Sequence, residues 1–354
     1  MHPKLLSTLS QYDSIILVGW WTGWHIQPII NLLEKGGGIR EASDGGLATQ
    51  DFLWIWWKNS EEEKAAQEHS IPFESITTLK LATTKSPKIL LYPFVLIQGI
   101  LQARKILSMH SALCTMHSLC VFSKWWPGSV AIGIAAWTLW IPLYIHESDT
   151  IPGRSSRILG KLATKIFLGF ESANRYFSSE KCEFIWQILH PVFYKWKVKS
   201  EKWKVLWKTE KKHILVICGS QWSRSVFNTI ANTSQELDVE WVIALGKLNQ
   251  WMHRNFSKFL SIQTYDYLTQ ADIVSLLAHT DLAITRGSAT TLAEIDTFSV
   301  KKIIIPLPYS ADDHQYWNAK AYEKKWDILL EQKNLGDLKK TIQKLWLNSP
   351  HSNI

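Results

Sequence analysis

Short apolar runs alternate with longer amphipathic segments along the whole chain. A first series of apolar runs comprises SIILVG (14–19), DFLWI (51–55), SLCVF (118–122), PLYIHE (142–147) and TKIFLGF (164–170). A second series comprises HILVICGS (213–220), VEWVIALG (239–246), LAITRG (282–287) and KKIIIPLP (301–308). Helix-like segments such as NSEEEKAAQEH (59–69) and SATTLAEIDTF (288–298) lie between them. This alternation predicts parallel sheets covered by helices, and the two series predict two doubly wound α/β domains.

The segment HPVFYKWKVKSEKWKVLWKTEKKH (190–213) separates the two series. It is basic and only weakly periodic, which is typical of a linker and domain entry. It therefore predicts an N-terminal domain over residues 1–190 and a C-terminal domain over residues 191–335. The stretch LGDLKKTIQKLW (335–346) is periodic and predicts a terminal helix at about residues 336–349.

Length and composition narrow the class of protein. The 354 residues suffice for two domains, and the longest apolar run, VAIGIAAWTLWIPLYI (130–145), is interrupted by Pro142. Because a membrane span needs about 20 apolar residues, this run predicts a helix followed by a strand. We also expect no signal peptide at the N-terminus. The four cysteines lack metal-type spacing and fit reduced thiols in a cytoplasmic protein.

The formal net charge of +8 is compatible with three kinds of partner. A nucleic acid, an anionic membrane surface and a phosphorylated substrate would each favour a basic protein. No nucleic-acid recognition motif accompanies the charge, so we expect no nucleic-acid partner.

Two loops after predicted strands suit a phosphate. In CGSQWSRS (218–225) a strand leads into Ser220, and a helix begins near Ser223. In TRGSATTLAEID (285–296) Gly287 opens a helix whose first turns carry Thr290 and Glu294. A helix N-terminus offers free N–H groups to an anion, and Glu294 could bind ribose hydroxyls. The alternatives are an ordinary strand-to-helix turn capped by Ser220 and a capping arrangement with a solvated Glu294.

Other polar residues have structural alternatives too. Asp312 and Asp313 in PLPYSADDHQYWNA (306–319) fit turn acids better than metal ligands, and we expect no metal site. His25 and His146 are candidate general bases, although a lone histidine is more often only hydrogen-bonded.

The segment KLATTKSPKILLYPFVLIQGILQARKIL (80–107) is apolar with basic flanks. It suits either a membrane contact or a buried helix with snorkelling lysines.

Tryptophan is abnormally frequent, with 20 residues against 17 glycines. The stretch VGWWTGWHIQP (18–28) places three of them in a strand-to-helix turn, where the backbone geometry favours glycine.

Five motifs in order along the chain carry a family resemblance. They are GWWTGWH (19–25), KWWPGS (124–129), AAWTLWIPLYIHESDTIPG (135–153), CGSQWSRS (218–225) and the pair RGSATTLAEI (286–295) with LPYSADDHQYWNA (307–319). The sequence resembles the MurG family, the N-acetylglucosaminyltransferases that convert lipid I to lipid II in peptidoglycan synthesis. The family's first loop reads GGGTGGH and its fourth GGSQG.

The resemblance implies a GT-B fold, two Rossmann-like domains that face a cleft, with the terminal helix joined to the N-terminal domain. It implies an inverting transfer from UDP-N-acetylglucosamine to the 4-hydroxyl of the lipid I sugar, with no cofactor besides the donor. His25 is the first candidate base and His146 the second, and Glu294 is counted with them as a candidate catalytic residue. The residues that match donor-binding positions are Thr22, Gly23, Trp24, Asp149, His190, Ser220, Gln221, Ala289, Thr290, Thr291, Leu292, Ala293, Glu294 and Gln315.

The resemblance also implies a location and partners. The acceptor, undecaprenyl-pyrophosphoryl-MurNAc-pentapeptide, is a lipid, so we expect a peripheral protein on the cytoplasmic face of the membrane, with residues 80–107 toward the anionic surface. Two departures concern the donor site, since Asp149 replaces a family Asn and His190 replaces a common Arg. Alternatives are a related GT-B lipid glycosyltransferase and a degenerate nucleotide-sugar-binding protein.

Many of the tryptophans stand where the family has glycine. These positions are Trp20, Trp21, Trp24, Trp56, Trp57, Trp125, Trp126, Trp140, Trp186, Trp222 and Trp326. In contrast, Trp54, Trp137 and Trp317 match positions where the family carries tryptophan. Our hypothesis is that UGA codons meaning glycine have been read as tryptophan. Restoring glycine at these positions would bring the 17 glycines to 28, or about 8%, near the usual ~7%. We call that sequence the glycine-restored chain.

Overall fold

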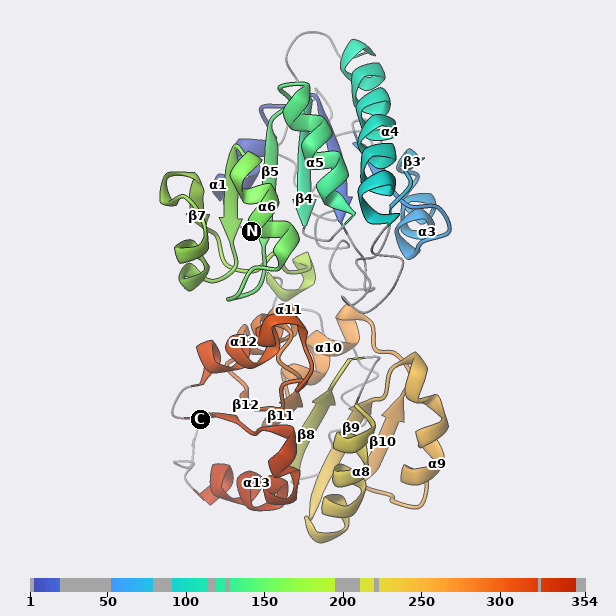
Figure 1. Cartoon of the computed structure of the whole chain (residues 1–354). Coiled ribbons are helices and arrows are strands. Elements are labelled where there is room, and N and C mark those ends of the chain that lie inside the picture. The colour runs from blue at the N-terminus through green and yellow to red at the C-terminus, as the bar shows by residue number, and fades with distance from the viewer. Residues whose placement is uncertain are drawn as a thin grey trace. The chain divides into compact units, whose positions relative to one another are not determined.

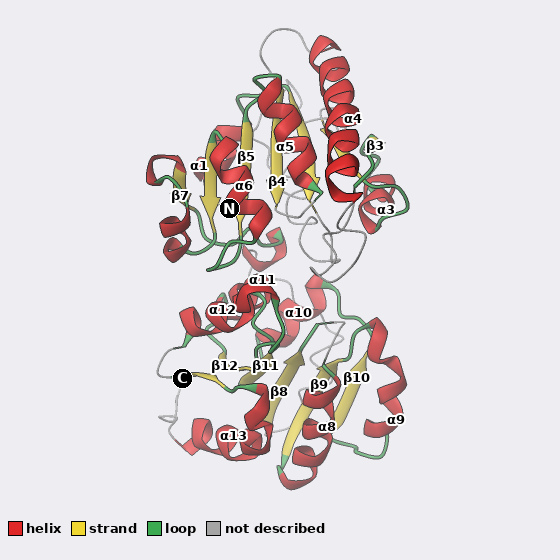
Figure 2. Cartoon of the chain, viewed as in Figure 1, coloured by secondary structure: helices red, strands yellow, loops and turns green. Residues whose placement is uncertain are grey.

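Figure 1 presents a computed structural model of the chain. It describes residues 3–19, 52–78, 91–113, 119–124, 128–194, 211–219, 223–323 and 326–347. The chain divides into two units, Met1–Pro191 and Val192–Ile354, each with its own hydrophobic core. Each unit is built on one parallel sheet with helices packed against it (Figure 2). The predicted fold class, two doubly wound α/β domains of the GT-B type, is therefore confirmed.

The first unit contains a seven-stranded parallel sheet in the order β3-β2-β1-β4-β5-β6-β7. Its strands are β1 (Ser14–Gly19), β2 (Phe52–Trp56), β3 (Phe73–Ser75), β4 (Leu119–Lys124), β5 (Leu143–Glu147), β6 (Lys165–Leu168) and β7 (Cys182–Phe184). Its helices are α1 (Pro3–Leu9), α3 (Glu61–Glu68), α4 (Tyr92–Leu113), α5 (Ser129–Thr138) and α6 (Arg154–Leu162), with short 3-10 helices η3 (Glu171–Tyr176) and η4 (Ser179–Lys181). The 3-10 helix η5 (Pro191–Tyr194) spans the boundary between the two units. Every residue of β1, β2, β4 and β5 is buried, which explains why these strands are continuous apolar runs in the sequence.

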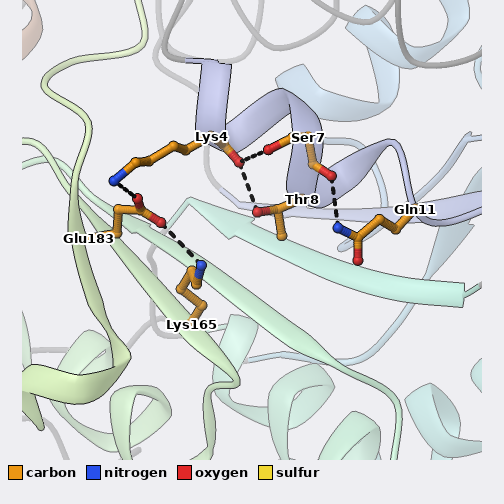
Figure 3. A network of polar contacts seen from close by, with 6 residues as sticks. All are labelled: Lys4, Ser7, Thr8, Gln11, Lys165 and Glu183. Carbon is orange, nitrogen blue, oxygen red and sulfur yellow. Dashed lines mark hydrogen bonds and ion pairs between the residues drawn. The ribbon is translucent and has the colours of Figure 1, made fainter.

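Ion pairs fasten α1 to one edge of this sheet. In Figure 3 the Glu183 carboxylate of β7 lies between Lys4 Nζ, at 2.5 Å, and Lys165 Nζ, at 3.1 Å. Burial would raise the pKa of Glu183, but the hydrogen bonds and charges of the two lysines outweigh burial and hold that pKa below its ordinary value.

The second unit contains a six-stranded parallel sheet in the order β10-β9-β8-β11-β12-β13. Its strands are β8 (Lys212–Ile217), β9 (Val239–Ala244), β10 (Ile262–Tyr265), β11 (Leu282–Thr285), β12 (Lys301–Ile304) and β13 (Asp327–Leu329). Its helices are α8 (Arg224–Thr233), α9 (His253–Phe256), α10 (Gln270–Leu277), α11 (Ala289–Asp296), α12 (His314–Tyr322) and α13 (Leu338–Leu347), with 3-10 helices η6 (Ser234–Glu236), η7 (Lys247–Met252), η8 (Ala311–Asp313) and η9 (Gln332–Asp337). Strand order reverses between β8 and β11, and ligands of such sheets bind outside the carboxyl ends of the strands at this switch point.

The terminal helix differs from the sequence-based expectation. Leu338, Ile342 and Leu345 of α13 are buried in the core of the second unit. The apolar face of this helix therefore packs into the core of the second unit, next to α8, whereas the sequence analysis assigned the helix to the N-terminal domain.

None of the described helices combines the length and hydropathy that a membrane crossing requires. The described residues also contain no group of three or more His, Cys, Asp or Glu side chains placed to hold a metal ion.

Candidate functional site

The turn after β8 requires a glycine. Gly219 has a φ of 73°, in the left-handed region that side chains disfavour. Four residues later Ser223 precedes α8, and its hydroxyl donates to the Cys218 carbonyl at 2.8 Å. The helix thus begins where the sequence predicted, at the switch point of the second sheet. Ser220 and Gln221, predicted to bind the donor, lie outside the described residues.

The turn after β11 is pressed against α12. At Gly287 an added Cβ would lie 2.1 Å from the backbone oxygen of Gln315, so only glycine fits without a shift. The Asn318 side-chain amide donates to the Gly287 carbonyl at 3.1 Å. These contacts bring the predicted residue Gln315 beside the start of α11, although 28 residues of sequence separate it from Gly287. Asn318 thereby also lies beside the start of α11.

Gln315 has a second contact that fixes its side chain. Its Oε1 accepts a hydrogen bond from the Leu307 N–H at 3.0 Å, which ties α12 to the segment after β12. Asp312 and Asp313 lie in the intervening turn with φ values of 50° and 52°, and both are exposed. Asparagine and aspartate tolerate this conformation better than most residues, in agreement with the turn-acid interpretation.

Glu294 and Thr290 are buried on α11. Glu294 is 3% exposed and Thr290 2%, so the alternative of a solvated Glu294 is wrong. Ser288 precedes α11 without a side-chain capping bond. Ala289, Leu292 and Ala293 are buried on the same helix and Thr291 is half-buried. Since burying a carboxylate is costly, such a residue is a good candidate for a functional contact.

Two residues of this site were missed by the sequence analysis as candidates. Arg286 is 5% exposed, and its Nη1 donates to the Ile305 carbonyl at 3.1 Å and to Gln332 Oε1 at 2.8 Å. Tyr267 follows β10, and its pKa is raised by burial and further by the charges of Asp272 and Glu294. For Arg286 the available signal was its position at the end of the predicted strand LAITRG, whereas the strand before Tyr267 left no pattern in the sequence.

In the first unit, His146 lies near the end of β5, and Asp149 lies in the loop that follows. His146 is fully buried, and its ring nitrogens lie 3.2 Å from the Trp186 carbonyl oxygen and 3.3 Å from the Ser148 hydroxyl. Asp149 is 6% exposed, and its N–H donates to Glu147 Oε1 at 2.8 Å. An imidazole enclosed in this way suits a role in fixing the strand end, because a general base needs a nitrogen that reaches the substrate.

The remaining predicted residues lie elsewhere. His190 is half-buried in the segment between β7 and η5. Thr22, Gly23, Trp24 and His25 are in the loop after β1 and lie outside the described residues.

Comparisons with known proteins agree with this architecture. Residues 15–168 match the glycosyltransferase family 28 N-terminal domain, and residues 213–353 match the family 28 C-terminal domain. The chain is 28% identical over 337 residues to the UDP-N-acetylglucosamine–N-acetylmuramyl-(pentapeptide) pyrophosphoryl-undecaprenol N-acetylglucosamine transferase of Thermosipho melanesiensis, covering 94% of this chain and 90% of that one. It is 29% identical over 271 residues to the protein of the same name from Sulfurihydrogenibium sp., covering 72% and 74%.

Solved structures show the same fold. The crystal structure of Acinetobacter baumannii MurG superposes with a TM-score of 0.70 at 20% identity, covering 94% of this chain and 90% of that chain. A putative UDP-N-acetylglucosamine 2-epimerase from Listeria monocytogenes superposes with a TM-score of 0.65 at 12% identity, covering 95% and 88%.

The two parallel sheets have the fold that these solved structures share, and in the second unit the turns after β8 and β11 lie at the switch point of the sheet. Both halves of the chain match the two domains of one family in the correct order, and the chain belongs to glycosyltransferase family 28.

Proposed function

We propose that the chain transfers N-acetylglucosamine from UDP-N-acetylglucosamine to the 4-hydroxyl of the MurNAc sugar in undecaprenyl-pyrophosphoryl-MurNAc-pentapeptide, with inversion at the anomeric carbon. The curated relatives are named for this transfer, and they align over most of their length. The observation that carries the proposal is Glu294. Its carboxyl is buried on the helix that starts at the switch-point turn, where the family resemblance places the donor.

The second unit supplies the donor contacts in this proposal. The N–H groups at the start of α11 and the hydroxyl of Thr290 suit the diphosphate, because a helix N-terminus favours an anion. The Glu294 carboxylate accepts hydrogen bonds from the ribose hydroxyls, and Gln315 contacts the sugar. The donor substrate alone provides the reacting group, without a separate cofactor.

The first unit supplies the acceptor side. His25 takes the proton from the attacking 4-hydroxyl, as the first-ranked base of the sequence analysis. His146 fixes the end of β5, because both of its ring nitrogens lie within hydrogen-bonding distance of protein oxygens. The loop after β5 then holds Asp149 toward the donor sugar.

A Glu294→Gln variant tests the donor contact. Replacing the buried carboxylate weakens charge-assisted hydrogen bonds to the ribose, which are worth about 1.5–3 kcal/mol. We expect kcat/KM for the donor to fall about 10- to 100-fold, measured as transfer of labelled N-acetylglucosamine to a lipid I analogue by the glycine-restored chain.

The exposed Glu323, at the end of α12, provides the matched control. Glu323→Gln should retain full transfer. Equal kcat/KM in Glu294→Gln and Glu323→Gln would contradict the assigned contact, and no transfer by the parent chain would refute the function.

We further propose that α4 contacts an anionic membrane surface. Phe94, Ile97 and Leu101 recur at helical spacing and are 72%, 56% and 62% exposed. The opposite face, with Ala103 and Leu107, is buried in the core of the first unit. The helix therefore has two apolar faces, one packed in the core and one open, with Arg104 and Lys105 exposed beside the latter. This arrangement suits a peripheral protein at the cytoplasmic face of the membrane.

The double variant Phe94→Glu/Leu101→Glu tests this surface. Each exposed side chain that enters the membrane interface contributes part of the ~1.5–3 kcal/mol of full burial. We expect co-sedimentation with vesicles containing anionic phospholipid to weaken at least about 10-fold, with the thermal unfolding midpoint unchanged. Leu260→Glu, at a fully exposed leucine of the second unit, is the control and should bind as the parent does. Unaltered vesicle binding by the double variant would exclude α4.

A further inference from the structure

The loop after β5 contains two buried carboxyl groups on alternate residues. Glu147 is fully buried and Asp149 is 6% exposed. The Asp149 N–H donates to Glu147 Oε1 at 2.8 Å, so the first carboxyl directly orients the backbone of the second.

The remaining contacts of this loop come from two other segments of the first unit. The Gly169 N–H, after β6, donates to the Glu147 carbonyl at 2.7 Å. The Gln187 side-chain amide, after β7, donates to the Ser148 carbonyl at 2.7 Å. A Cβ at Gly169 would lie 2.1 Å from Gln187 Nε2, so glycine makes room for this amide. Hydrogen bonds from two other segments therefore fix the backbone that leads to Asp149.

The charges around Glu147 explain its protonation. Burial, and next the charge of Asp149, raise the pKa of Glu147 to about 8, while the polarity of the Ser156 hydroxyl and of the Asp149 and Ser148 N–H groups partly offsets them. Two residues from other segments, Gly169 and Gln187, contact this loop, and both are uncharged. The titratable neighbour on β5 itself is His146. With a pKa of about 8, Glu147 is mainly protonated at neutral pH.

We propose that Glu147 is a positioning residue: by accepting the Asp149 N–H, its buried carboxyl fixes the loop that carries Asp149 for hydrogen bonds from the donor sugar. The role of Asp149 toward the donor rests on the proposed function. The contact between Glu147 and the Asp149 N–H does not, because it belongs to the geometry of the loop itself. The paired carboxyls are also particular to this chain, since the resemblance places an Asn at position 149.

Thermal unfolding tests the carboxyl pair without reference to activity. The ordinary pKa of Glu147 is 4.5, and its folded value is about 8. Between these values the unfolded chain binds fewer protons than the folded chain, so this residue destabilises the fold increasingly as pH rises. Glu147→Gln removes this dependence. We therefore compare the thermal unfolding midpoints of Glu147→Gln and the parent at each pH. The difference, variant minus parent, should increase by about 5 °C from pH 5 to pH 8.

Glu183→Gln is the matched control, because the pKa of Glu183 is shifted in the opposite direction. Its midpoint difference from the parent should stay constant over pH 5–8. A constant difference for Glu147→Gln as well would overturn the protonated, buried state of Glu147, whether or not the chain transfers sugar.

Donor binding tests the positioning role. In the glycine-restored chain, calorimetry with UDP-N-acetylglucosamine should give a dissociation constant for Glu147→Gln within about threefold of the parent at pH 7. Glu147→Ala, which cannot accept the Asp149 N–H, should bind about tenfold more weakly. The affinity of the parent should also fall above pH 8, and that of Glu147→Gln should not. Equal affinity of Glu147→Ala and the parent would overturn the positioning role, whereas absence of donor binding by the parent would refute the proposed function and leave the unfolding result standing.

Discussion

The glycine-restored chain is expected to bind UDP-N-acetylglucosamine about a hundredfold more tightly than the chain with its tryptophans, a difference of about 2.7 kcal/mol. Trp24 and Trp222 match glycines of turns that face phosphate groups in the resembled family. A bare backbone lets N–H groups approach an anion, and an indole would occupy that volume. Isothermal titration calorimetry of both chains measures the difference, and equal dissociation constants would refute the steric argument.

Trp140 provides structural support for this prediction. It follows α5 with a φ of 57° and a side chain that is 91% exposed. Its N–H donates to the Trp137 carbonyl at 3.2 Å, and the Ile141 N–H donates to the Ala136 carbonyl at 2.9 Å. These two bonds define a Schellman motif, in which the residue at the Trp140 position is usually glycine. The indole makes no compensating core contact here, since it lies almost entirely in solvent.

Trp186 has the same conformation, with a φ of 64°. Its carbonyl oxygen lies 3.2 Å from His146 Nε2, so the strained residue also holds a predicted site residue in place. A bulky residue in the left-handed region is a genuine outlier, with a cost of about 1–2 kcal/mol. Both positions match family glycines, and their geometry therefore agrees with the codon hypothesis.

Single replacements distinguish a tryptophan that stands at a family glycine position from one that stands at a family tryptophan position. Trp140→Gly should raise the free energy of unfolding by about 1 kcal/mol, because it relieves the left-handed strain. Trp137→Gly, three residues earlier within α5, is the control and should lower it by about 0.5–1 kcal/mol through lost helix propensity. In the gene, UGA at Trp140 with UGG at Trp137 would support the hypothesis, and UGG at both would reject it.

The central strands of both sheets could be predicted from sequence, whereas the edge strands could not. β1, β4, β8 and β11 pair on both sides, are almost entirely buried and appear as apolar runs. The missed strands are β3 (FES), β7 (CEF), β10 (IQTY) and β13 (DIL), and each is the edge strand of its sheet. An edge strand is short and partly solvated, so its residues need not be apolar, and pairing with one neighbour leaves no pattern in the sequence.

The site was predictable to the extent that its residues follow strands. The position of Glu294 on the helix after the strand LAITRG was predicted, but its burial depends on packing around α11 that no local pattern records. The sequence of α4 likewise could not decide its role. Because the helix has two apolar faces, its sequence fits a core helix and a membrane contact equally well. Glu147 was missed because the resemblance pointed to Asp149 alone. The contact between the two buried residues depends on the folded loop and leaves no pattern in the sequence.

Gly287→Ala is expected to have the largest effect of any single substitution in the second unit. The added Cβ would lie 2.1 Å from the Gln315 backbone oxygen and 2.7 Å from its carbonyl carbon. Backbone atoms cannot rotate away as a side chain can, so α12 must move from the β11–α11 turn. We expect a loss of about 1–3 kcal/mol in the free energy of unfolding, typical of overpacking, measured by denaturant titration. In the glycine-restored chain, donor affinity should also fall at least about tenfold, because the move displaces Gln315 from the start of α11.

Gly336→Ala separates this clash from a general effect of replacing glycine. Gly336 lies in η9 of the same unit, and an added Cβ there would meet nothing within 4 Å. Its replacement should change the free energy of unfolding by no more than about 0.5 kcal/mol and leave donor affinity unaltered. If Gly287→Ala matched Gly336→Ala in both measurements, the contact between the turn and α12 would not be the element that sets the donor site. If Gly287→Ala lost stability but kept donor affinity, the contact would stabilise the fold without positioning Gln315 for the donor.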